Sequence, residues 1–332
     1  MKKTVTLLCA CITWCGVMAQ TPVLKINEEG KYKIAQFTDT HLDLSTDYRR
    51  AQSARTIDQL NYILDSEKPD LVIFTGDVVT GKPAAEGWKM ILAPVAERNL
   101  PFCVTLGNHD AEQDISRTEI AEIVTSFKGT LNTRKSGELD DVALEVMSRK
   151  GDKVDKVLYC IDSHDYSTLD GVDGYAWITR EQIDWYRSLS AKYAAANGNR
   201  PLPSMAFFHI CLHEFAPAWA NDENTHAGRR AEDECPGVLN TGMYSSMVEM
   251  GDICGVFVGH DHDIDYVVAQ NGIALGYGRF SGYDTTYNNL RHGVRIIELH
   301  EGVREFESWI HERDGRIVNR ILFRDGKIER LD

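Results

Sequence analysis

The amino-acid sequence predicts an α/β protein in which two mixed β-sheets pack together and are flanked by helices. Three observations support this fold class. Short apolar runs without polar alternation are typical of strands that are buried on both faces. Helical patterns separate the first of these runs. Apolar pairs joined by Asn-Gly or Asp-Gly turns follow in the C-terminal third and indicate antiparallel hairpins.

The N-terminal half begins as a β-α-β-α-β unit. The runs YKIAQF, DLVIFT and PFCVTL have the β-branched and aromatic content of strands. Between them, residues 49–70 and 85–101 repeat apolar side chains every three or four positions, although Pro94 is a potential kink. Crossovers of this kind make the three strands parallel.

Later elements follow the same logic. Residues 179–198 open with a Thr179–Gln182 capping box and predict a helix that ends near Gly198. Hairpins are expected to turn at residues 271–272 and 314–315. Because these C-terminal strands are antiparallel, we expect them to form a second sheet packed on the first.

Residues 1–19 differ in kind from the rest of the chain. Lys2 and Lys3 precede an apolar run that is too short for a membrane span, and Val17 and Ala19 suit cleavage before Gln20. We therefore predict a signal peptide over residues 1–19, a single domain over 20–332, and a secreted or periplasmic protein. Lipoprotein processing at LCAC (residues 8–11) is the less favoured alternative.

The net charge bears on which macromolecules the protein could bind, and the cysteines bear on metal sites and disulfides. Loss of Lys2 and Lys3 would change the formal net charge from −14 to −16, which disfavours nucleic acid and anionic membrane surfaces. We expect neither nucleic-acid binding nor stable membrane insertion, and the oligomeric state stays open. The cysteines lack metal-ligand spacing. Cys211–Cys235 is the best candidate for a disulfide, and whether it forms also stays open.

Five apolar runs end in residues that can bind metals. The carboxyl ends of parallel strands lie on one side of a sheet, so we expect these side chains to meet at one rim. Seven oxygen or imidazole ligands suit two four-coordinate ions if one carboxylate bridges them. Helix capping by the Asp and Asn residues, and burial of the histidines in the core, are the structural alternatives. The seven candidates are Asp39, His41, Asp77, Asn108, His209, His260 and His262.

The motifs D-x-H, G-D, G-N-H-D, a lone His and G-H-x-H occur in this order from residue 39 to 262. This order resembles the calcineurin-like metallophosphoesterase family, which includes purple acid phosphatases and cyclic-nucleotide phosphodiesterases. The resemblance implies a four-layer α/β/β/α sandwich. It also implies two metal ions, such as iron, zinc or manganese, whose identity stays open. One would be bound by Asp39, His41, Asp77 and His262, and the other by Asp77, Asn108, His209 and His260.

The same resemblance implies catalytic roles and an activity. His109 would act at the scissile oxygen, and Asp110 would orient the His109 ring. We expect a phosphomonoesterase acting on a small phosphate ester. A phosphodiesterase for cyclic nucleotides or phospholipid head groups is the alternative, and a non-catalytic binding protein is a remote one. Purple acid phosphatases carry an iron-binding tyrosine where this chain has Thr80, which argues against a purple Fe(III) site.

Other polar residues are weaker candidates. Arg49, Arg50, Arg279 and Tyr277 are possible contacts for a phosphate or a leaving group, but solvated surface is the preferred interpretation for each. His164 also follows an apolar run, and a structural role is favoured for it because the family has no ligand there.

Overall fold

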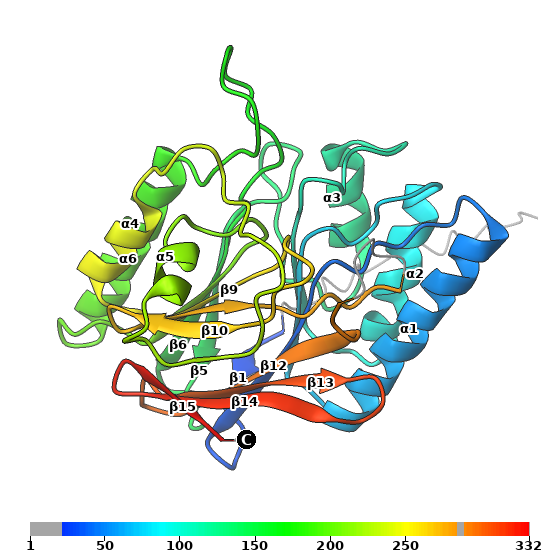
Figure 1. Cartoon of the computed structure of the whole chain (residues 1–332). Coiled ribbons are helices and arrows are strands. Elements are labelled where there is room, and N and C mark those ends of the chain that lie inside the picture. Colours follow the sequence, from blue (N-terminus) through cyan, green and yellow to red (C-terminus); the bar gives the residue numbers. More distant parts are fainter. Residues whose placement is uncertain (1–21, 284–288, 332) are drawn as a thin grey trace, which may run out of the picture.

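The computed structural model describes residues 22–283 and 289–331. Two mixed sheets face each other, and helices cover both outer faces (Figure 1). This confirms the predicted four-layer arrangement. The predicted signal peptide lies outside the described residues, and intact-mass measurement of the exported protein would test it. Within the described residues, no helix has the length and apolar character needed to cross a membrane.

The elements follow one another in the chain with short connections. In order they are β1 (Leu24–Lys25), β2 (Lys31–Phe37), α1 (Asp47–Glu67), β3 (Leu71–Thr75), α2 (Ala84–Glu97), β4 (Phe102–Thr105), α3 (Arg117–Ser126), β5 (Val142–Met147), β6 (Val154–Cys160), α4 (Arg180–Ala196), β7 (Ser204–Phe207), α5 (Phe215–Ala220), β8 (His226–Ala227), α6 (Met243–Met250), β9 (Ile253–Val258), β10 (Val267–Gln270), β11 (Ile273–Tyr277), β12 (Gly293–His300), β13 (Phe306–Glu312), β14 (Ile317–Arg324) and β15 (Lys327–Arg330).

The alternation of side chains along each strand explains the layers. In β3, Leu71 and Ile73 enter the core between the two sheets, whereas Val72 and Phe74 pack against the helical layer of α1, α2 and α3. The central strands of the other sheet follow the same rule, with α4, α5 and α6 on their outer face. Apolar runs without polar alternation are therefore needed in both sheets, because both faces of these strands are buried.

Of the C-terminal strands, β10 and β11 lie in the second sheet as expected, whereas the last four are placed differently. Strands β2, β3 and β4 are parallel, as predicted, and both predicted hairpins form. However, β12 pairs antiparallel with β2, so β12 to β15 extend the first sheet in the order β15-β14-β13-β12-β2-β3-β4. The second sheet has the order β1-β5-β6-β7-β9-β11-β10-β8. Without β12, the free edge of β2 would expose unpaired backbone groups.

The helix ends agree with the capping signals. Thr179 and Gln182 form the predicted capping box at the start of α4, which ends at Ala196. Helix α1 begins after Thr46, whose side chain accepts a hydrogen bond from Arg49 N. Pro94 lies inside α2, where its ring is buried.

Glu67, at the end of α1, connects the helical layer to the first sheet through hydrogen bonds. Its carboxylate accepts hydrogen bonds from His311 Nδ1 (2.6 Å), Trp309 Nε1 (3.0 Å) and Lys33 Nζ (3.1 Å). Burial alone would raise the pKa of this carboxyl group, but the three donors outweigh burial and lower the pKa to about 2.

Glu67→Gln is therefore expected to lower the free energy of unfolding at pH 7 by about 1–3 kcal/mol. The folded pKa lies below the ordinary glutamate value of 4.5, so this stabilisation is present above pH 4.5 and is lost as the pH falls towards 2. Urea unfolding at pH 7 and pH 3 measures the difference between wild type and variant. A difference at pH 3 as large as at pH 7 would contradict the assignment. Glu86→Gln is the control, because Glu86 is an exposed partner of Arg50.

Candidate metal centre

The predicted ligands lie between the carboxyl ends of the two sheets. Asp39 and His41 follow β2, Asp77 follows β3, and Asn108 follows β4, all in the seven-stranded sheet. The remaining histidines follow two strands of the eight-stranded sheet: His209 comes after β7, and His260 and His262 come after β9. The rim predicted from the sequence is therefore a junction of two sheets.

Six of these residues form two overlapping groups of metal-binding atoms. In each group, every ligand atom lies within 4.8 Å of the others. Asp77 belongs to both groups, and Asn108 Oδ1 lies 3.2 Å from His209 Nε2, at the second one. This is the grouping that the family resemblance implies, with Asp77 as the shared carboxylate. The groups are Asp39, His41, Asp77 and His262, and Asp77, His209 and His260.

Two of the candidate ligand nitrogens lack a hydrogen-bond partner among the described residues, and a third faces the oxygens of two other candidate ligands. His209 Nδ1 donates to the Thr75 carbonyl at 2.8 Å, which leaves Nε2 facing Asn108 Oδ1 at 3.2 Å and Asp77 Oδ2 at 3.3 Å. The Nε2 atoms of His41 and His260 are buried and have no hydrogen-bond partner among the described residues. Buried, neutral imidazole nitrogens without a partner fit a bound cation, and the carbonyl contact of His209 is the usual way to orient a metal-binding imidazole.

The electrostatics also fit a cation. Burial, with help from His262, lowers the pKa of His41 to about 4. Burial, with help from His209, lowers that of His260 to about 3, so both rings are neutral and able to ligate at pH 7. Burial would lower the pKa of His209 as well, but the Asp77 carboxylate outweighs it and raises that pKa to about 10. The two buried carboxylates thus draw positive charge into the site, and a metal ion would supply it.

The backbone at these ligands is strained. Asp39, His41, Asp77 and His260 have φ values of 51°, 44°, 48° and 78°, in the left-handed region that non-glycine residues rarely occupy. Gly76 shows why glycine precedes Asp77: with φ at 84°, an added Cβ would lie 2.4 Å from His209 Nδ1. The motifs at the strand ends therefore supply the candidate metal-binding side chains, and their glycines also allow the backbone to pass close to those side chains.

His109 is held by a carboxylate, but not by the predicted one. Its Nδ1 donates to Glu112 Oε2 at 2.6 Å. The buried Asp110 carboxylate instead accepts from the backbone nitrogens of Val78 (2.8 Å), Val79 (3.0 Å) and Gly107 (2.8 Å). The predicted contact between Asp110 and the His109 ring is therefore wrong, because Asp110 joins the loops after β3 and β4.

Tyr166 connects this pair to the candidate ligands. Its hydroxyl donates to Glu112 Oε1 at 2.8 Å and accepts from Asn108 Nδ2 at 3.2 Å. With its amide nitrogen used in this way, Asn108 turns its oxygen towards the second group of ligands. Glu112 and Tyr166 have no motif in the sequence, and Tyr166 comes from the loop between β6 and α4.

A cavity of about 370 Å³ opens over the candidate centre. His109, Glu112, Tyr175, Glu232 and Cys235 contribute to its wall. Among the weaker candidates, Arg49 also lines it, and its Nε lies 3.2 Å from Asp43 Oδ2. The other weak candidates lie elsewhere.

Three of those weak candidates are engaged in other contacts. Arg50 pairs with Glu86, whereas Arg279 and Tyr277 are buried, which contradicts the preferred surface interpretation for both. Arg279 binds Asp265, and the Tyr277 hydroxyl donates to Asp261 at 2.7 Å. His164 has the favoured structural contact, with its Nε2 lying 3.1 Å from Gln182 Oε1 at the start of α4.

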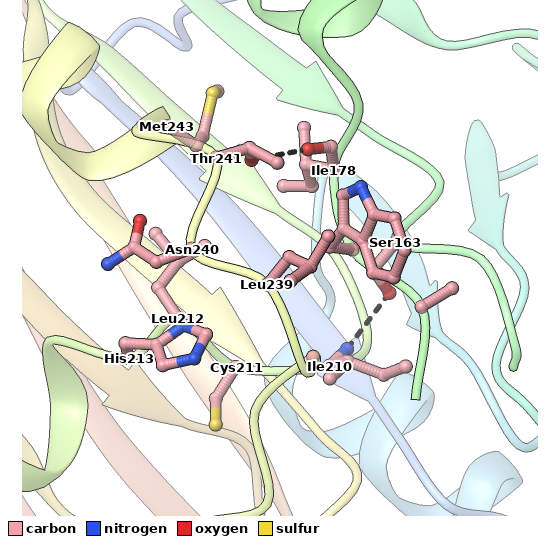
Figure 2. Close-up of a pocket in the computed structure, with 13 residues that line it drawn as sticks. Ser163, Ile178, Ile210, Cys211, Leu212, His213, Leu239, Asn240, Thr241 and Met243 are labelled. Carbon is pink, nitrogen blue, oxygen red and sulfur yellow. Dashed lines mark hydrogen bonds between the residues drawn. The ribbon is translucent and has the colours of Figure 1, made fainter. Parts of the chain in front are cut away.

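A second, small cavity lies beside Cys211. Its volume is about 20 Å³, room for about one water molecule. Its walls are joined by bonds from Ile210 N to Ser163 Oγ and from Thr241 Oγ1 to Ile178 O (Figure 2). Cys211 is buried here and Cys235 is exposed, and both are free thiols. The disulfide considered between them is absent from the structure.

The comparisons with known proteins agree with this geometry. A family model described as calcineurin-like phosphoesterase matches residues 32–263. The chain is 28% identical to "Probable inactive purple acid phosphatase 29" of Arabidopsis thaliana, covering 83% of this chain and 78% of that protein. It is 28% identical to "Phosphatase DCR2" of Saccharomyces cerevisiae, covering 86% and 54%.

A solved structure supports the fold. The dimetal phosphatase from Danio rerio superposes with a TM-score of 0.62 at 12% identity, covering 88% of this chain and 98% of that one. Together with the family model, which spans most of the chain, these matches show that the chain belongs to the calcineurin-like phosphoesterases.

Proposed function

We propose that this protein is a dimetal phosphohydrolase and that it cleaves phosphomonoesters. The observation that carries the proposal is the pair of ligand groups that share Asp77 beneath an accessible cavity. Asn108 completes the second group, so all seven predicted ligand positions are present and convergent. When bound, a metal pair supplies Lewis-acid activation of the phosphoryl group and of water.

The chain itself provides the proton for the leaving oxygen. Glu112 holds Nδ1 of His109, so the opposite ring nitrogen is available to a substrate in the cavity, and the His109 side chain is 39% exposed. The backbone nitrogen of His109 also donates to Asp77 Oδ1 at 2.9 Å, which fixes the ring relative to the candidate centre. This geometry suits general-acid catalysis by an imidazole.

A phosphodiesterase activity is the second candidate, and one contact favours it. Tyr175 lines the cavity, stacks on Tyr166 with ring centroids 5.7 Å apart, and meets His260 edge-on at 4.4 Å. This aromatic wall offers apolar surface to a second ester substituent. Substrates in both classes would be small phosphate esters.

A substrate panel run after metal analysis tests the proposal. Protein with two metal equivalents is expected to hydrolyse nitrophenyl phosphate and alkyl monoesters faster than bis(nitrophenyl) phosphate and cyclic nucleotides. Chelator-treated protein is the matched control and should be inactive. The relative in Arabidopsis thaliana carries the word "inactive" in its name. Metal-loaded protein that hydrolyses none of these esters would favour a binding protein on the same fold.

Iron-loaded protein is expected to lack the intense visible band of purple acid phosphatases. Thr80 lines the cavity where those enzymes place a tyrosine, and threonine has no phenolate. Among the neighbouring tyrosines, burial and the Glu112 contact raise the pKa of Tyr166 to about 12, so its hydroxyl stays protonated. A visible absorption spectrum with and without chelator is the measurement. A band that disappears in Tyr166→Phe would show that Tyr166 reaches the metal.

A further inference from the structure

A second open cavity, of about 560 Å³, lies between α1 and the turn that joins β13 to β14. Its wall includes Arg55 on α1, Tyr283, His292, and Arg313 in the turn. None of these residues belongs to the candidate metal centre. Three arginines and two carboxylates line the cavity in total, which is a net positive charge in a chain with a formal net charge of −14.

Two guanidinium groups are fixed on Tyr283. Arg55 Cζ lies 4.3 Å from the centre of the ring, and Arg313 Cζ lies 5.0 Å from it. Arg313 also donates to the Tyr283 hydroxyl at 2.7 Å, and Arg55 donates to Gln52 in the preceding turn of α1 at 3.1 Å. Within residues 22–283 and 289–331, neither arginine has a carboxylate partner. Contact with the ring orients each group without neutralising its charge.

The nearby carboxylates are already shared by other arginines. Asp314 accepts from Arg291 at 2.8 Å and from Arg316 at 2.9 Å. Glu312 pairs with Arg316 and with Arg279, which also binds Asp265. The charges of Arg55 and Arg313 therefore remain uncompensated within the described part of this cavity.

The pKa of His292 reflects the positive charge around this cavity. Burial, followed by the charges of Arg55 and Arg313, lowers its pKa to about 4. Its ring meets Tyr283 edge-on at 4.0 Å, and its buried Nδ1 has no hydrogen-bond partner among the described residues. The neutral ring contributes no charge of its own, and the guanidinium groups are the charged donors of this cavity.

We propose that the cavity between Arg55 and Arg313 is a second binding site, and that it takes an oxyanion, a phosphate or carboxylate group. Each guanidinium group lines the cavity and offers a planar fork of paired N–H donors that matches such a group. The site needs no metal ion, so this proposal stands independently of the proposed hydrolysis.

The cavity is joined to the candidate metal centre by the segment before Tyr283. The Phe280 ring lies 5.0 Å from His292 and 6.5 Å from His262. Gly282 N donates to the backbone oxygen of Asp39 at 3.2 Å. Along α1, Arg55 is about 9 Å beyond the level of Arg49, which lines the cavity over the metal centre. The oxyanion would be either a second anionic group of the substrate or a free anion.

Calorimetric titration with inorganic phosphate tests the site in the metal-loaded full chain. Wild type is expected to show two binding events, one at the metal centre and one at this cavity. Arg55→Gln and Arg313→Gln should each weaken the second event by about 10-fold or more. Arg187→Gln on α4 is the control, because it removes the same charge from an exposed pair with Glu249. Unchanged affinity for both events in the Arg55 and Arg313 variants would overturn the proposal.

Kinetics then separates the two sources, and this arm rests on the proposed function. If the cavity holds a group of the substrate, Arg55→Gln should raise KM for an ester with a second phosphate and leave KM for nitrophenyl phosphate unchanged. If it holds a free anion, phosphate binding should fall while neither KM changes. Loss of only the metal-centre event in Asp77→Asn would show that the two sites are distinct.

Discussion

Asp77→Asn is expected to abolish binding of at least one metal ion and to lower turnover by more than about 100-fold. Asp77 is the only residue that belongs to both described groups of ligand atoms, so its charge bears on both ions. Replacement of residues that merely support metal ligands typically costs 10–100-fold, so a shared ligand should cost more. An asparagine retains an oxygen for the 2.9 Å bond from His109 N, so the local backbone should persist.

Metal stoichiometry by elemental analysis, together with circular dichroism, checks this expectation. Asn108→Ala should lose only the ion of the second group, because Asn108 contacts His209 and not the first group. Asp252→Asn is the matched control: Asp252 is also a buried carboxylate, but it accepts from Tyr186 on α4 and lies in neither group. Two metal equivalents retained in Asp77→Asn would refute the shared-ligand assignment.

Most of the fold is predictable from short stretches of sequence. Apolar runs indicate strands buried on both faces, and capping residues indicate helix ends, and both kinds of pattern involve residues that are close in the chain. The runs that became β2, β3 and β4, and the Thr179–Gln182 box, are examples. Strand pairing across the chain was not predictable in the same way. A hairpin turn specifies which two strands pair, but nothing near residue 314 specifies that β12 pairs with the edge of β2 rather than with the second sheet.

The candidate ligands were predictable for a related reason. They follow buried strands, where the backbone has positive φ values at Gly76 and Asp77. This backbone restricts which residues can stand there, because a Cβ at Gly76 would collide with His209. Their neighbours were not predictable. Asp110 is next to His109 in sequence but turns towards backbone nitrogens, whereas Glu112, three residues further on, reaches the ring. Tyr166 is brought to the site only by tertiary folding.

His109→Ala is expected to keep both metal ions and to lower turnover on alkyl phosphates by about 10²–10⁴-fold. An alkoxide leaves poorly without a proton, whereas a nitrophenolate leaves readily, so the loss on nitrophenyl esters should be much smaller. Equal losses on both would indicate an electrostatic role at the phosphoryl oxygens, and loss of a metal equivalent would make His109 a ligand.

Glu112→Gln should reproduce this leaving-group pattern with a smaller loss, about 10–100-fold on alkyl esters, because glutamine can still accept from His109 Nδ1 but has no charge. Glu122→Gln, which removes an exposed charge paired with Arg134, is the control and should leave both rates unchanged. The double variant gives the sharpest test. If Glu112 acts through His109, then His109→Ala combined with Glu112→Gln should be no slower than His109→Ala alone, because the carboxylate then has no ring to orient. Additive losses would instead assign Glu112 a separate contact with substrate, for which its place in the cavity wall leaves room.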